Sequence, residues 1–244
     1  MRATNSLTLG TDRALYRGEL PATGWHRHAS PVLLMGLSGR FALHLPHAPA
    51  QSCHSALVAT GVEHLFDPCG EQVATVYLEP DSAEARSLRT HFQSRGGVIF
   101  DPAVPVQARS SMDAYLRHFD LPSLLQLDCP VAAPIDARVA RSLQCLRQLR
   151  EQPLGRDGAA AAAQLSASHF NHLFHAEMGV SFRSYRVWSQ VRAAMAGLGA
   201  DVNLTQAALD GGFVDSSHFS RMFRQTFGMT PSSVLKPLRE IVRV

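Results

Sequence analysis

The sequence of 244 residues lacks the features of a secreted or membrane-spanning protein. Its N-terminal stretch, MRATNSLTLGTDRALYRG, has no apolar core of the kind that a signal peptide needs. No apolar run approaches the roughly 20 residues needed to cross a bilayer. The four cysteines form no close pair, so they indicate neither a disulfide framework nor a CxxC zinc site. We therefore expect a cytoplasmic protein without a membrane partner, in which the cysteines are free thiols.

Charged residues are also few, at 18% against 45% hydrophobic residues, and this composition is ordinary for a globular protein. The formal net charge of +3 is unevenly distributed. Residues 1–134 hold 10 Lys/Arg against 12 Asp/Glu, which gives −2, whereas residues 135–244 hold 13 against 8, which gives +5. A basic domain is what a polyanionic partner requires, although a domain of +5 can also simply be soluble.

A proline-bearing stretch, LDCPVAAPID, marks the main domain boundary at 127–136, just where the charge balance changes sign. Short apolar runs separated by turn residues are typical of strands, and they lie before this boundary at 31–45, 55–62 and 71–80. Stretches with helical spacing then occupy 81–93 and 108–119. An α+β protein is thus predicted, with a β-rich domain at 1–105, a helical linker or dimerisation segment at 106–134 and an all-helical domain at 135–244.

One phrase occurs twice in the helical domain. SHFNHLFHAEMGVSF begins at Ser168, and SHFSRMFRQTFGMTP begins 49 residues later at Ser217. The aligned apolar residues have i, i+3, i+4 spacing, so they are predicted to pack inward from a helix. Gly179 and Gly228 occupy the same place in the two copies, and glycine there suits a helix C-cap.

A short helix and a tight turn precede each copy, in GAAAAAQLS and in LTQAALDGGFVDS. Helix, turn and second helix is the helix-turn-helix plan, whose second helix can enter the DNA major groove. The segment at 182–198 reads as a connecting helix, which could hold two such units about one DNA turn, ~34 Å, apart. Two helical hairpins could also repeat because they pack well. Hydroxyls beside arginines on the outward face of the second copy favour DNA binding instead.

The run LTQAALDGGFVDSSHFSRMFRQTFGMTPS resembles the C-terminal signature of AraC/XylS-type transcriptional regulators, and the resemblance extends over 135–244. It implies a DNA-binding domain of two helix-turn-helix units. The base-reading residues that it implies are Ser168, Asn171 and His172 in the first unit, and Ser216, Ser217, Ser220 and Arg221 in the second. It also puts Arg224 near phosphates, with Arg183 and Arg186 as further candidates.

Two departures from the family pattern concern the charge and the anchoring of this domain. The family usually has an arginine where this chain has Gln190, so the connecting helix is expected to lack a common polar anchor. His172 and His175 stand where the second copy has Arg221 and Arg224, so the first unit is expected to hold phosphate more weakly. A metal site on His169, His172 and His175 is not favoured, because the first and third diverge around the helix. His169 is expected to be structural, like His218.

The β-rich domain contains GWHRH and, further on, ATGVEH. His26 and His28 alternate on a predicted strand and point to the same side, and His64 follows a glycine turn, so three imidazoles could form an open metal site. This pattern resembles the cupin-like β-barrel sensor domain of many AraC-type regulators. Val32 and Leu33 stand where a metal cupin usually has a glutamate, which leaves Glu63, Cys53, His54 or Cys69 as possible helpers. No cofactor is required, and the histidines could bind a divalent metal, bind an organic effector or be structural.

Two functions compete on this basis. The first is a sequence-specific DNA-binding regulator, not an enzyme, whose N-terminal domain senses a small-molecule or metal effector. Its family resemblance implies double-stranded promoter or operator DNA and RNA polymerase as partners, a possible homodimer, and activation more often than repression. The alternative is a cupin-type metalloenzyme, for example a dioxygenase, with a helical extension. The missing carboxylate and the complete DNA-binding signature disfavour the enzyme, and an acidic β-rich domain fits poorly with a purely architectural DNA protein.

Overall fold

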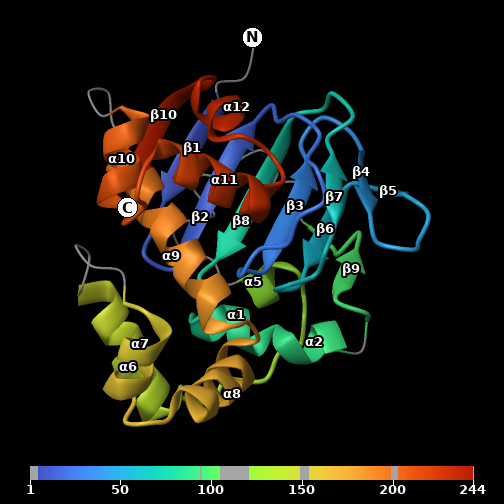
Figure 1. Cartoon of the computed structure of the whole chain (residues 1–244). Helices are drawn as coiled ribbons and strands as arrows, with labels where there is room; N and C mark the ends of the chain where they lie inside the picture. The colour runs from blue at the N-terminus through green and yellow to red at the C-terminus, as the bar shows by residue number, and fades with distance from the viewer. Residues whose placement is uncertain (1–4, 94, 105–120, 149–153, 199–202, 244) are drawn as a thin grey trace. The chain divides into compact units, whose positions relative to one another are not determined.

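The computed structural model describes residues 5–93, 95–104, 121–148, 154–198 and 203–243 (Figure 1). The chain forms two compact units, the first combining Met1–Ala132 with Arg224–Val244 and the second consisting of Ala133–Phe223. The first break lies close to the predicted boundary at 134. The second break falls inside the predicted DNA-binding domain, so the C-terminal 21 residues, Arg224–Val244, belong to the first unit.

The first unit is built on a seven-stranded sheet with the order β10-β1-β2-β8-β3-β6-β9. Its strands are β1 (Asn5–Leu9), β2 (Arg13–Gly18), β3 (Val32–Gly36), β6 (Ser55–Val58), β8 (Val73–Leu78), β9 (Val98–Phe100) and β10 (Leu238–Arg243). A separate three-stranded sheet has the order β5-β4-β7, with β4 (Phe41–His44), β5 (Gln51–Cys53) and β7 (Leu65–Asp67). The predicted β-rich N-terminal domain is therefore confirmed. The predicted cupin-like barrel is not confirmed, because the described strands form two open sheets and no closed one.

The interior strand β3 has a continuous apolar sequence, VLLMG. All five of its residues are buried, because alternate side chains enter two different cores. Leu33 and Met35 pack into one core with apolar residues of α1 (Ala83–Ser87), α2 (Arg89–Gln93) and α5 (Leu121–Leu124). Val32 and Leu34 pack into the other core with apolar residues of the three-stranded sheet.

Strand β10 was not predicted, since the sequence after 135 was read as entirely helical. It pairs in parallel with β1, for example Leu7 with Ile241, and the C-terminal strand thus lies beside the first strand of the chain (Figure 1). The segment LREIVR is short and only half-buried. Its strand conformation depends on the edge of β1, a partner more than 200 residues away in sequence, which local patterning does not reveal.

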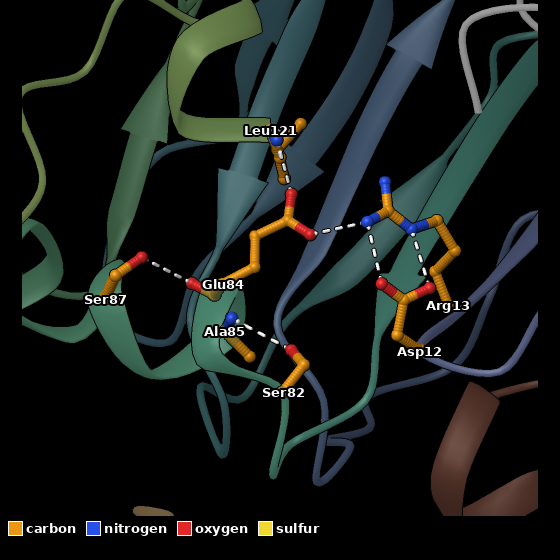
Figure 2. Close-up of polar contacts among 7 residues, drawn as sticks. All are labelled: Asp12, Arg13, Ser82, Glu84, Ala85, Ser87 and Leu121. Carbon is orange, nitrogen blue, oxygen red and sulfur yellow. Dashed lines mark hydrogen bonds and ion pairs between the residues drawn. The ribbon is translucent and has the colours of Figure 1, made fainter. Parts of the chain in front are cut away.

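The linker prediction is only partly covered by the structure. The expected helix at 108–119 lies outside the described residues. Of the rest, α5 contributes Leu121 and Leu124 to the core of the first unit. Figure 2 shows how α5 is held: the Glu84 carboxylate accepts a hydrogen bond from the Leu121 amide and, at 2.8 Å, one from Arg13 Nη2. Arg13 also pairs with Asp12. One carboxylate therefore joins α1, α5 and β2.

The second unit contains α6 (Ala137–Gln148), α7 (Arg156–Ala162), α8 (Ala167–Met178), α9 (Phe182–Gly197) and α10 (Leu204–Asp210). The next helix, α11 (Ser216–Phe227), passes from the second unit into the first, which also holds α12 (Pro231–Leu235). Phe170 and Phe174 are fully buried and contact Phe182 edge-on at ring-centroid distances of 5.2 and 5.3 Å. The inward packing predicted from the repeat is confirmed. Within the described ranges, no helix is long and apolar enough to cross a membrane.

Replacing Glu84 by Gln should lower the free energy of unfolding by about 2 kcal/mol, because the side chain keeps its shape but loses its charge in a nearly buried ion pair. The side chains of Arg13 and Glu84 are 13% and 9% exposed. The matched control is Glu63→Gln, whose partner Arg27 is 63% exposed, and it should cost less than about 1 kcal/mol. Urea unfolding followed by circular dichroism measures both. Equal losses in the two variants would contradict the proposed importance of Glu84.

Candidate nucleic-acid interface and histidine cluster

The first helix-turn-helix unit is formed by α7 and α8. The alanine run forms a helix as predicted, and Ala159, Ala160 and Ala163 are buried, so small side chains allow close packing. Ser166 caps α8, with its hydroxyl accepting a hydrogen bond from the His169 amide at 3.3 Å. Gly179 ends the helix in the left-handed conformation, at φ 73°, as the repeat predicts.

The second unit, formed by α10 and α11, follows the same plan. Asp215 caps α11 by accepting a hydrogen bond from the His218 amide at 2.6 Å. Phe213 in the turn packs edge-on against His218 and Phe219. Gly228 follows α11 with φ 70°, which confirms the second predicted glycine cap.

The connecting helix α9 has a polar anchor, contrary to the expectation for Gln190. The Gln190 Nε2 donates to the Gly212 carbonyl at 2.8 Å, and so fixes the turn between α10 and α11 against α9. Gly211 makes this close approach possible. A Cβ there would lie 2.7 Å from both the Gln190 carbonyl oxygen and the Ala194 Cβ. Gln190 therefore supplies a polar anchor that the sequence pattern did not predict.

The predicted DNA-contacting residues lie on the outward faces of α8 and α11. Those on α8 are all exposed, namely Ser168, Asn171 and His172. On α11, Ser217, Arg221 and Arg224 are exposed, while Ser216 and Ser220 are half-buried. Within the described part of the chain, these eight side chains have no hydrogen-bond or ion-pair partner. Their polar groups are therefore available to another molecule.

Other predicted residues of this domain have different environments. Arg183 is exposed, whereas Nε of Arg186 is buried without a partner among the described residues. His218 packs against Phe213, as a structural histidine should. His169 was expected to be structural as well, but it is exposed, and no equivalent aromatic contact holds it among the described residues.

In the first unit, the structure brings His26, His28 and His64 together. Their ring centroids lie 4.3 to 5.6 Å apart, and one ring nitrogen of each lies within 4.8 Å of one from each of the others. The backbones of His26 and His64 form an isolated bridge with two hydrogen bonds of 3.0 Å. His26 and His28 thus lie in an extended connection and not on the predicted regular strand, yet they still point to one side.

Each of these imidazoles is hydrogen bonded through Nδ1 to a backbone carbonyl two residues away. His26 pairs with Gly24 at 2.9 Å, His28 with Ser30 at 2.7 Å and His64 with Val62 at 3.0 Å. Burial lowers the pKa of all three, that of His64 to about 4. The three imidazoles are consequently neutral near pH 7.

The proposed helper ligands do not join this cluster. Glu63 pairs with Arg27, Cys53 lies in the apolar core, His54 faces the Gly39 carbonyl and Cys69 faces the Asp67 carbonyl. The cluster of His26, His28 and His64 is the one group in the described residues with the geometry of a metal site. The exposed histidines of α8 form no such group.

Comparison with known proteins identifies the helical region. Residues 159–237 match the family model of a helix-turn-helix domain. The chain carries a helix-turn-helix domain. Over 95 residues it is 35% identical to the transcriptional activator NphR of Rhodococcus sp, a match that covers 38% of this chain and 28% of NphR. The predicted resemblance to AraC/XylS-type regulators is confirmed, and the class of DNA-binding regulator is favoured over that of a metalloenzyme.

The whole chain shares its fold with ToxT of Vibrio cholerae. It is 12% identical to unsaturated fatty acid-bound ToxT from strain SCE256, with a TM-score of 0.61 and coverage of 98% of both chains. For ToxT of strain O395 bound to (E)-4-(8-methylnaphthalen-1-yl)but-3-enoic acid, the identity is 11%, the TM-score 0.62 and the coverage 92% of this chain and 98% of the other. The chain thus shares with ToxT a fold in which a β-rich N-terminal part precedes a helical part.

The Gly211→Ala variant should lose about 1 to 3 kcal/mol of stability, because its new Cβ must push α9 away from the turn of the second helix-turn-helix unit. Gly155→Ala is the matched control, since a Cβ there meets nothing within 4 Å. Its expected cost is a few tenths of a kcal/mol. Thermal unfolding of both variants measures the difference in stability. A Gly211→Ala chain as stable as wild type would show that the turn does not require a glycine for its close packing against α9.

Proposed function

We propose that the whole chain is a sequence-specific transcriptional regulator that binds double-stranded DNA through α8 and α11 and responds to a small effector bound by its β-rich domain. The supporting observation is the exposed row of unpartnered hydroxyl, amide and guanidinium groups on two helices of the same helix-turn-helix plan. Such groups are suited to base edges and phosphates. The AraC-type family match to residues 159–237 supports the same reading.

The two helices carry different chemistry. On α11, we propose that Arg221 forms paired hydrogen bonds with a guanine and that Arg224, one turn further, contacts a phosphate. On α8, Asn171 and His172 offer hydrogen bonds with little permanent charge. We therefore propose unequal half-sites, with α11 contributing more of the affinity and α8 contributing mainly selectivity.

The direction of regulation, the partners and the cellular location are proposals of the same kind. NphR is named a transcriptional activator, and this favours activation. We propose RNA polymerase as a partner, a homodimer as the assembly and the cytoplasm as the location. The ToxT structures hold a fatty acid and an arylbutenoic acid, so a small organic effector for this chain is in keeping with the shared fold.

Arg221→Ala should weaken binding to the operator by about 1 to 3 kcal/mol while changing affinity for random DNA much less. The operator is first defined by selection from a random duplex pool, and fluorescence anisotropy then measures both affinities. The control Arg239→Ala removes one exposed positive charge from β10, outside the two helices proposed to contact DNA. If both variants lose the same affinity on both DNAs, Arg221 acts only through its charge.

A further inference from the structure

We propose that His26, His28 and His64 bind one divalent transition-metal ion of the zinc class, and that this ion fixes the backbone contact at which α11 ends. The metal site rests on geometry within the first unit. Its effect on DNA binding rests in addition on the function proposed above.

The hydrogen bonds at Nδ1 determine which nitrogen of each ring is free. A carbonyl oxygen can only accept, so each Nδ1 must carry the hydrogen and each Nε2 must present a lone pair. Three acceptors therefore gather in a buried place. Nε2 of His28, a residue only 3% exposed, has no hydrogen-bond partner among the described residues. A buried acceptor without a partner is costly, and a cation that accepts three lone pairs removes the cost.

The donor set suits a transition metal better than calcium or magnesium. Three neutral imidazoles are typical ligands of zinc, copper, nickel and cobalt, whereas calcium and magnesium prefer oxygen. A tetrahedral ion that lies about 2.1 Å from each of three nitrogens requires those nitrogens to be roughly 3.4 Å apart. The ring nitrogens of the cluster are at most 4.8 Å apart, so each ring has to move by less than about 1 Å to bind the ion. The carbonyls of Gly24, Ser30 and Val62 supply the outer hydrogen bonds that orient metal-binding histidines.

Three protein ligands leave a coordination position open. Among the described residues no carboxylate or thiolate belongs to the cluster, so water, hydroxide or an anionic group of an effector would complete the coordination. The ion would then take part in effector sensing, because the affinity of the three histidines for the ion would depend on which group occupies the open coordination position. The outer carbonyls offset part of its charge by polarising the imidazoles.

The first connection to α11 runs through Gly24. The Gly24 carbonyl accepts from His26 Nδ1, and the Gly24 amide donates to the Gly228 carbonyl at 2.7 Å. Gly228 is the glycine that ends α11, and its own amide donates to the Arg224 carbonyl at 2.8 Å. The contact is tight, because a Cβ at Gly228 would lie 2.4 Å from the Gly24 oxygen and 2.7 Å from His26 Nδ1. One peptide group thus lies between an imidazole of the cluster and the end of α11.

The second connection is aromatic. The ring of His28 contacts Tyr77 edge-on at 5.3 Å, and Tyr77 contacts Phe227, the last residue of α11, edge-on at 5.5 Å. All these residues belong to the first unit. His26 and His28 are therefore each linked to the last turn of α11 through one intermediate residue. An ion that fixes both rings would restrict the motion of that turn. Phe227 and Arg221 lie on the same helix, fewer than about two turns apart.

Metal binding is tested on the full chain, produced without a polyhistidine tag, stripped with EDTA and titrated with Zn²⁺ and with Co²⁺. We expect one ion per chain and a visible absorption band for Co²⁺ in a nitrogen-ligated site of low symmetry. His64→Gln and His26→Gln should each lower the affinity for Zn²⁺ by about 100-fold or more. His54→Gln is the matched control, because His54 also faces a backbone carbonyl but lies outside the cluster, and it should bind as wild type does.

Three results would overturn the site. These are wild-type protein that binds less than one ion per chain, a Co²⁺ spectrum unchanged from aqueous Co²⁺, and equal losses of affinity in His54→Gln and His64→Gln. Circular dichroism verifies that the variants fold. If one does not fold, the wild-type Co²⁺ spectrum and stoichiometry decide the question without it.

The connection to α11 is tested by amide hydrogen exchange with and without Zn²⁺. Exchange in peptides covering Gly24 and 224–229 should slow about 10-fold or more on metal binding, while α7 in the second unit serves as the unaffected reference. His64→Gln should show no slowing. Metal binding without slower exchange at 224–229 overturns the connection. Slower exchange in a chain that binds no operator would instead contradict the proposed DNA function and leave the metal site standing.

Discussion

The hydrogen bond from the Gly24 amide to the Gly228 carbonyl joins the β-rich domain to the end of α11. It requires a glycine at 228, which has a positive φ and where a Cβ would meet Thr23 and His26, whereas a Cβ at Gly24 would meet nothing closer than 3.5 Å. The parallel pairing of β10 with β1 continues the same attachment. The last turn of α11 is therefore a structural part of the first unit.

The two helix-turn-helix units show how one backbone plan can carry unequal surfaces. The buried phenylalanines, the serine or aspartate N-caps and the left-handed glycines are shared, and they specify the helix and its turn. The outward residues are not under that constraint. On α9, the Gln190 amide donates to the Gly212 carbonyl, and a Cβ at the neighbouring Gly211 would lie 2.7 Å from the Gln190 carbonyl oxygen.

The features of this chain that could be predicted are those that depend on short-range sequence patterns. The i, i+3, i+4 spacing of Phe170 and Phe174 and the position of Gly179 were enough to predict the packing and the cap of α8. Strand β10 and the open sheets could not be predicted in this way, because edge pairing and sheet closure depend on partners far away in sequence. The histidine cluster could be predicted in part. The H-x-H pattern predicts that the side chains of His26 and His28 point to the same side, but their proximity to His64 depends on the backbone bridge between His26 and His64.

The position of β10 also has a consequence for synthesis of the chain on the ribosome. β1 is made first and β10 last, so the outer edge of β1 stays without its partner until residue 243 has been added. An unpaired strand edge invites pairing with other chains. Nascent copies translated together on one messenger RNA can therefore associate through this edge until β10 covers it, after which β10 is itself the edge strand of the sheet.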